Sequence, residues 1–173
     1  MSNLATRRTN RQLNRRWLVI VVLLLSASFG LAFIHPSGNV SLRRSDKELM
    51  HTAQIDRKVL ELMQRSCQNC HSEQTVWPWY SHFAPVSWLI EKDVTAGRSH
   101  WNMSSWEHNS SEERERILSL IGPMVRNRKM PLPQYLFLHP EAKLTGADAD
   151  LLYQWSRSER RRLKAEGQAA SLP

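Results

Sequence analysis

The residues best suited to chemistry form a single pentapeptide, Cys67-Gln68-Asn69-Cys70-His71. The chain has 2 cysteines, and both belong to this segment. Two thiols about one helical turn apart can add to the two vinyl groups of a haem, and the histidine that follows can ligate the iron. The C-x-x-C-H pattern therefore predicts one covalent haem c, held through Cys67 and Cys70, with His71 as an axial ligand.

Three other uses of these side chains compete with haem attachment. A disulfide or a thioredoxin-like dithiol would be expected in a βαβ context, which the sequence lacks. A structural zinc site would need a fourth ligand and usually a second ligand pair at matching spacing. A copper site could combine the two thiols, the imidazole and a methionine, because copper accepts soft sulfur ligands. Haem is favoured because the two thiols, the adjacent histidine and the predicted export all agree with it.

A second axial ligand must come from a distant segment that can cover the open face of the haem. The candidates are His82, His100, Met103, His108, Met124, Met130 and His139. Met130 is favoured because it follows a predicted helix and precedes Pro131, which biases its backbone toward an extended conformation. Met103 is the nearest methionine rival, whereas Met124 falls on the apolar face of a helix and is expected in the core. A histidine ligand would give a bis-histidine site of lower potential.

Four amphipathic helices are predicted around the motif, and no alternating strand pattern is found. They cover about residues 46–66, 85–97, 110–125 and 145–156. Gly97 is expected to end the second helix, and Gly122-Pro123 to kink the third or end it early. Thr145 and Asp148 have the T-x-x-D spacing of a capping box at the start of the fourth. The fold class predicted is all-α, with about four helices in the domain.

An apolar stretch precedes this domain. Residues 17–34 contain no charged side chain, and 18 residues of helix span ~27 Å, close to the hydrocarbon thickness of a bilayer. Five arginines precede the stretch, so it is predicted to be a single transmembrane helix with a cytoplasmic N-terminus and the domain on the periplasmic side. A cleaved signal peptide is the alternative, and the paired arginines match a twin-arginine signal only in part.

The charge of the chain is concentrated at its ends. The formal net charge is +8, and residues 1–16 and 157–173 carry the whole excess. A neutral body lacks the electrostatic footprint of a duplex-binding protein, so no nucleic-acid partner is expected. The predicted organisation is a basic N-terminus (1–16), an anchor (17–34), a linker (35–45), a haem-binding domain (46–156) and a basic tail (157–173). The tail is expected to be a solvated helix end that could meet an acidic partner or anionic lipid.

Several further segments have a distinctive composition. They are TVWPWY at 75–80, APVSWL at 84–89, Asp93-Val94 with Gly97-Arg98, MPLP at 130–133, Tyr135-Leu136 and LHP at 138–140. Together with the C-x-x-C-H motif, over about residues 55–156, they resemble the bacterial haem-binding domain family of small c-type cytochromes. The resemblance implies a cytochrome c-like helical fold, His71 and Met130 as axial ligands, and a membrane-anchored or exported protein. The resemblance does not account for the basic tail at 157–173.

Two functions follow from such a site. A haem with both axial positions filled by His71 and Met130 has no open position for a substrate, which favours one-electron transfer with membrane-embedded or periplasmic redox partners. The alternative is a small-ligand sensor or weak peroxidase in which the second ligand is displaced. No hydrolytic triad, carboxylate pair or phosphate loop is evident, so the chain is expected to be an electron-transfer protein and not an enzyme.

Overall fold

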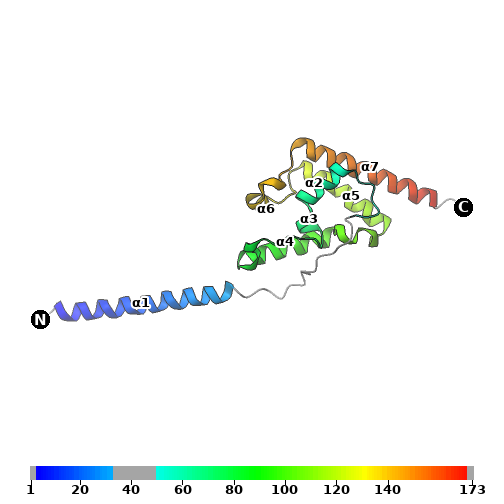
Figure 1. Ribbon diagram of the computed structural model, residues 1–173. Coiled ribbons are helices and arrows are strands. Elements are labelled where there is room, and N and C mark those ends of the chain that lie inside the picture. The colour runs from blue at the N-terminus through cyan, green and yellow to red at the C-terminus, as the bar shows by residue number, and fades with distance from the viewer. Residues whose placement is uncertain (1–2, 33–49, 171–173) are drawn as a thin grey trace. The chain divides into compact units, whose positions relative to one another are not determined.

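The computed structural model describes residues 3–32 and 50–170, and every regular element among them is a helix. The α-helices are α1 (Asn3–Ala32), α2 (Arg57–Ser66), α3 (Gln68–His71), α4 (Val86–His100), α5 (Ser111–Arg126), α6 (Pro133–Leu138) and α7 (Gly146–Ala170) (Figure 1). Three short 3-10 helices lie between them: η1 (Trp79–His82), η2 (Met103–His108) and η3 (Pro140–Ala142). The predicted all-α class is confirmed for the described residues, and α3 and α6 are additional to the four domain helices expected.

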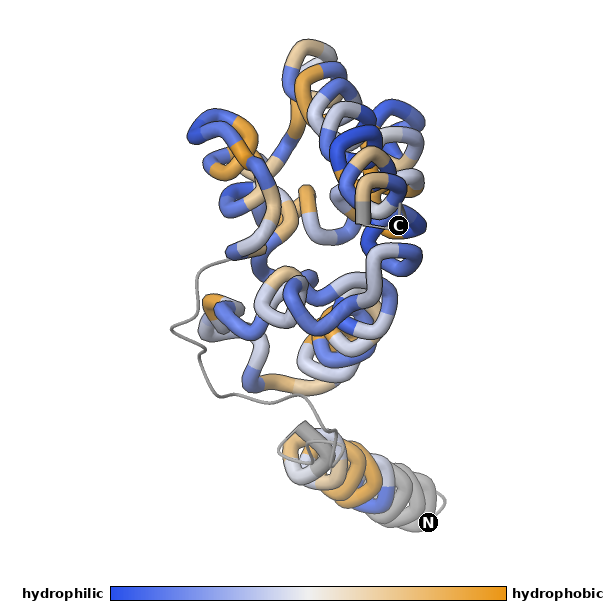
Figure 2. Tube along the Cα trace, turned by 90° about the vertical axis from the view of Figure 1, so that its right-hand side faces the viewer, coloured by the Kyte–Doolittle hydropathy of each residue, from blue (hydrophilic) through white to orange (hydrophobic). Residues whose placement is uncertain are grey.

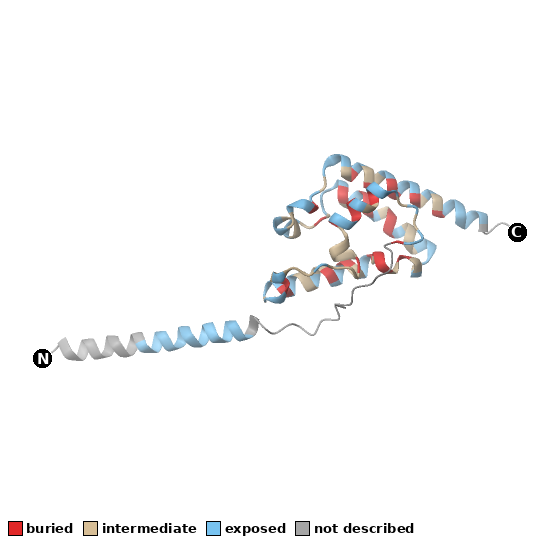
Figure 3. Cartoon of the chain, viewed as in Figure 1, coloured by how far each residue is buried: buried red, intermediate tan, exposed pale blue. Residues whose placement is uncertain are grey.

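The described chain divides into two compact units. The first contains α1 and residues 77–91, and the second contains residues 50–76 and 92–170. In the first unit, the Trp79 ring meets Tyr80 and Phe83 edge-on, at centroid distances of 5.8 and 6.2 Å. Along α1, residues 15–30 are exposed, and apolar residues predominate from Trp17 onward (Figures 2 and 3).

The anchor predicted at 17–34 falls only partly in the described chain, because residues 33 and 34 and the linker at 35–45 lie outside it. Within the part that is described, no helix has both the length and the apolar character needed to cross a membrane.

Side-chain hydrogen bonds cap the N-termini of three helices in the second unit. Asp56 accepts a hydrogen bond from the Val59 N–H at the start of α2 (2.9 Å). Ser110 does the same for Glu113 at the start of α5 (3.2 Å). Before α7, the Thr145 N–H donates to Asp148 (3.0 Å) and the Asp148 N–H donates to Thr145 Oγ1 (3.1 Å), which confirms the predicted capping box.

The core of the second unit lies between α2, η2, α5 and α7, as the buried positions in Figure 3 show. Its members are Met50, Val59, Leu62, Met63, Trp101, Met103, Trp106, Ile117, Leu118, Ile121, Val125, Ala149, Leu152, Trp155 and Leu163. Helices α5 and α7 are in close contact at Gly122, where an added Cβ would be 2.5 Å from Tyr153 Cδ2. Cys67 packs against this core, so the C-x-x-C-H segment begins at its edge.

One expected helix end is wrong: α4 continues past Gly97 to His100, and Gly97 is instead the point where α4 approaches Cys70. Of the two outcomes expected at Gly122-Pro123, the early end does not occur, because α5 runs through Pro123 to Arg126, close to the predicted end at residue 125. The first domain helix also begins later than expected, at Arg57, after its Asp56 cap.

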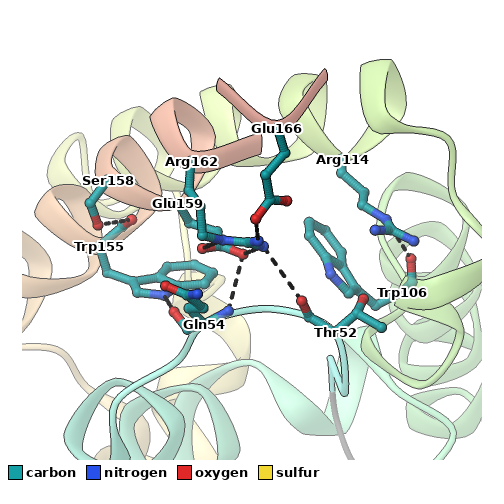
Figure 4. A network of polar contacts seen from close by, with 9 residues as sticks. All are labelled: Thr52, Gln54, Trp106, Arg114, Trp155, Ser158, Glu159, Arg162 and Glu166. Atoms are coloured by element: carbon teal, nitrogen blue, oxygen red, sulfur yellow. Dashed lines mark hydrogen bonds and ion pairs between the residues drawn. The ribbon is translucent and has the colours of Figure 1, made fainter. Parts of the chain in front are cut away.

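The predicted basic tail is part of the folded unit. Helix α7 does not fray after residue 156 but runs to Ala170, with Glu159 and Leu163 buried. Arg162 pairs with Glu159 and donates to the Thr52 carbonyl (3.4 Å), while the Gln54 N–H donates to Glu159 Oε1 (3.1 Å) (Figure 4). The interpretation of this segment as only a solvated helix end is therefore corrected, because its charges connect α7 to the chain preceding α2.

Candidate functional site

The pentapeptide begins where α2 ends and forms the one-turn helix α3. Cys67 is the last capping residue of α2, with its N–H bonded to the Met63 carbonyl (2.8 Å). The Cys67 carbonyl accepts hydrogen bonds from the N–H groups of Cys70 (3.2 Å) and His71 (2.9 Å). The turn thus places both cysteines and His71 on one short helix and its N-terminal cap. The cysteines are free and partly buried, so neither is consumed by a disulfide.

Burial keeps both thiols protonated at neutral pH. Desolvation, with a smaller contribution from the neighbouring Cys70, raises the pKa of Cys67 from 9.0 to about 12. Desolvation and the charge of Asp93 raise the pKa of Cys70 to about 11, although Arg98 opposes the shift. A reactive dithiol of the thioredoxin type needs a lowered thiol pKa, so these directions disfavour that alternative. Among the described residues, no group of three or more His, Cys, Asp or Glu side chains is placed to hold a metal ion.

The His71 ring is held by backbone hydrogen bonds with Trp101 and Gly97. Its Nδ1 lies 3.1 Å from the Trp101 carbonyl oxygen. Because a carbonyl only accepts, Nδ1 carries the proton and donates, which leaves the lone pair on Nε2. Burial lowers the pKa of His71, so the ring is neutral at pH 7, as a metal ligand requires. The Trp101 ring also lies against the imidazole, with centroids 5.3 Å apart.

Helix α4 approaches the motif at Gly97. A Cβ added at this position would lie 2.5 Å from the Cys70 carbonyl oxygen and 3.2 Å from the Cys70 Cβ. The first of these separations is well below van der Waals contact and involves backbone, which cannot rotate away. The absence of a side chain at Gly97 therefore decides how near α4 lies to the second cysteine.

Gly97→Ala is expected to destabilise the protein by about 1–3 kcal/mol, since α4 and α3 must separate to admit the methyl group. Urea unfolding followed by circular dichroism measures the change. Gly167→Ala is the matched control, because Gly167 is also helical and an added Cβ there meets nothing within 4 Å. The control should be neutral or stabilising by up to ~1 kcal/mol. Equal effects of the two variants would contradict a role for the close approach.

Hydrogen bonds from α4 and within the motif fix the loop that follows. Arg98 donates from Nε to the Ser72 carbonyl (2.9 Å) and from Nη2 to Thr75 Oγ1 (3.0 Å). Thr75 Oγ1 donates to the Asn69 carbonyl (2.7 Å), and the buried Ser72 hydroxyl donates to the Gln68 carbonyl (2.8 Å). These bonds hold α3, and with it the two thiols, in one orientation.

A buried N–H of Trp101, the residue that contacts His71, could donate to a polar group of a bound cofactor. The indole Nε1 of Trp101 is buried and has no acceptor among the described residues. A buried N–H without an acceptor costs about 1–3 kcal/mol, so a partner supplied on ligand binding would remove that cost. Two free thiols, a neutral imidazole with its lone pair on Nε2 and this unpaired N–H together fit a haem, which has vinyl groups, iron and carboxylates.

The candidates for the second axial ligand differ in burial. Met103 is fully buried within the core, and Met124 and Met130 are partly buried. His82, His100 and His108 are exposed, whereas His139 stacks on Tyr135 and bonds to Glu141 (3.0 Å). Met103 belongs to the hydrophobic core, whereas Met124 is only partly buried and is not among the core residues, so the expectation that Met124 lies in the core is wrong. Met130 lies between α5 and α6, and its assignment as a ligand stays a prediction.

Sequence reasoning missed four residues that shape the site. Trp101 orients His71, and Gly97 allows α4 to approach Cys70 closely. Asn69 donates a hydrogen bond to Tyr135 (2.9 Å), and Arg98 bonds to the loop that follows the motif. Gly97, Arg98 and Tyr135 occur in the distinctive segments, which is the signal that could have found them. Nothing in the sequence distinguishes Asn69 from a variable spacer between the cysteines.

Comparison with known families covers this whole region. A family model described as a haem-binding domain matches residues 27–158, which include the pentapeptide and Met130. Neither the curated proteins nor the solved structures contain a match to the chain. The match covers more than half of the chain and reaches from α1 into α7.

Proposed function

Because the chain belongs to the haem-binding domain family, we propose that it is a c-type cytochrome that transfers single electrons at the outer face of the cytoplasmic membrane. It has a cytochrome c-like helical domain that carries one haem c through Cys67 and Cys70. When bound, the haem supplies one-electron redox chemistry at its iron. The observation that carries the proposal is the His71 hydrogen bond to the Trp101 carbonyl, which puts the proton on Nδ1 and the lone pair on Nε2, in the same turn as the two cysteines.

The protein's own residues account for the binding part of this function. His71 is neutral and orientated by Trp101, so it can ligate without first losing a proton. The thiols are held by α3, whose position is set by Gly97 and by the Arg98 bonds to the following loop. Met130 would be the second protein ligand of the haem iron, and a thioether ligand would raise the potential relative to a histidine ligand. With two protein ligands on the iron, the site would have no open position for a substrate.

Met130→Ala is expected to abolish the weak far-red absorption band that a sulfur ligand gives to oxidised haem iron. The thioether is the source of that band, so its removal opens the position to water or another side chain. Optical spectra of the oxidised and reduced full-length protein measure the change. Met103→Ala is the matched control: Met103 is fully buried in the core, so this variant loses stability but keeps the band. Loss of the band in the control and its retention in Met130→Ala would overturn the assignment.

Carbon monoxide and cyanide distinguish electron transfer from the sensor or weak-peroxidase alternative. Two protein ligands resist displacement, so neither molecule should shift the spectrum rapidly if electron transfer is the function. Rapid binding to the unmodified protein would favour the alternative, in which Met130 or another second ligand leaves the iron.

The proposed partners are membrane-embedded or periplasmic redox proteins, with the chain itself anchored through residues 17–34. The apolar run of α1 and the excess of arginines before it support this topology. Membrane fractionation with alkaline washing, followed by protease treatment of spheroplasts, tests it. Retention in the membrane with cleavage of the haem domain from outside is expected, and recovery of the protein in the cytosol would contradict the proposal.

A further inference from the structure

Asn69, which lies between the two cysteines, uses both ends of its side-chain amide. Its Oδ1 accepts the Val76 N–H (3.0 Å), and its Nδ2 lies 2.9 Å from Tyr135 Oη. A backbone N–H can only donate, so the atom facing Val76 is the oxygen and the atom facing Tyr135 is the nitrogen. Asn69 therefore donates to Tyr135, a residue 66 positions further along the chain.

Tyr135 belongs to α6, a short helix that core packing does not hold in place. None of its six residues is buried. Two consecutive residues of α6 make long-range side-chain bonds instead: Gln134 donates to Asp93 Oδ2 (3.1 Å), and Tyr135 accepts from Asn69. The Tyr135 ring is itself orientated by stacking on His139, at 4.3 Å between centroids and 19° between planes. The bond to Asn69 is thus a defined contact between α6 and the haem-attachment helix α3.

Met130 lies between this contact and the end of α5. On its N-terminal side, the N–H groups of Lys129 and Met130 both donate to the Met124 carbonyl, at 2.9 and 3.2 Å. On its C-terminal side, only residues 131 and 132 separate it from α6. The Met130 backbone is therefore restrained on both sides, and a displacement of this backbone segment would strain one of these two attachments.

We propose that the Asn69–Tyr135 hydrogen bond is a clamp that holds the Met130 segment against the haem-attachment helix, with Tyr135 as a positioning residue for the Met130 ligand. The inference rests on the proposed function, in which Met130 ligates the iron. Breaking the clamp lowers the free energy needed to move Met130 aside. A small external ligand that competes with Met130 then binds more tightly.

The test is a titration of the oxidised full-length holoprotein with imidazole, followed by its absorption spectrum. Tyr135→Phe removes only the hydroxyl and keeps the ring stacked, so the far-red band should remain in the absence of imidazole. Imidazole should bind about 5-fold more tightly than to the unmodified protein, as expected for the loss of one hydrogen bond. Asn69→Ala should increase the affinity at least as much, and the double variant no more than Asn69→Ala alone, because both changes remove the same bond.

Tyr153→Phe is the matched control. Its hydroxyl lies on α7 and has a long contact of 3.4 Å with Arg157, so its removal should leave the imidazole affinity unchanged. The clamp alone would be overturned if Tyr135→Phe, the control and the unmodified protein all bound imidazole with the same affinity and all kept the far-red band. Absence of covalent haem from the unmodified protein, or a band that survives Met130→Ala, would instead overturn the proposed function on which the clamp rests.

Discussion

Arg162→Ala is expected to lower the free energy of unfolding by about 3 kcal/mol, because it leaves the Glu159 carboxylate buried without its cation. The Glu159 side chain is 2% exposed, and Arg162 donates to both of its oxygens, at 2.8 and 2.6 Å. The pair also reaches the chain before α2, where the Gln54 N–H donates to the same carboxylate. Chemical denaturation followed by circular dichroism measures the loss.

Arg116→Ala is the matched control for this prediction. Arg116 donates to both oxygens of Glu113 at 2.7 and 2.6 Å, with the same i,i+3 spacing on a helix. That pair is exposed, so water and salt screen it and its removal should have no measurable effect on stability. Similar losses in the two variants would show that burial does not determine the cost. A stable Arg162→Ala variant would restore the interpretation of the basic tail as a solvated helix end.

The double variant Cys67→Ser/Cys70→Ser is expected to give no haem stain after denaturing electrophoresis. Serine cannot form a thioether with a vinyl group, so any haem that binds is lost when the protein unfolds. Each single variant keeps one attachment point and should stain more weakly than the unmodified protein. The measurement is the stain intensity per amount of full-length protein, prepared under conditions that load the unmodified chain.

Ser66→Ala provides the control next to the motif. The Ser66 hydroxyl is buried and has no hydrogen-bond partner among the described residues, so its removal should leave the stain at full intensity. Staining of the double cysteine variant at the intensity of this control would contradict covalent attachment. A colourless unmodified protein would remove the basis for a cytochrome altogether and bring back the copper alternative.

Local features of the fold could be predicted because their causes lie within three or four residues. The Ser110 and Thr145 caps each bond to an N–H three positions away, and helices start after both, where the sequence predicted them. Asp56 makes the same kind of cap, although its helix was expected to begin at about residue 46. Helix ends were harder to predict. Gly97 and Pro123 are local helix breakers by type, yet α4 and α5 pass through them, and Gly97 is instead the point where α4 approaches Cys70.

The sequence by itself determined the haem-binding family and the all-α class, since residue types, spacing and periodicity are sufficient for both. Only the tertiary structure decided which His71 nitrogen carries the proton, through the carbonyl of Trp101, and which residue accepts from the Asn69 amide. It also made Glu159 and Leu163 part of the core instead of a tail. The physical reason is that these contacts join positions 30 to 105 residues apart, and local spacing carries no information about which distant side chains meet.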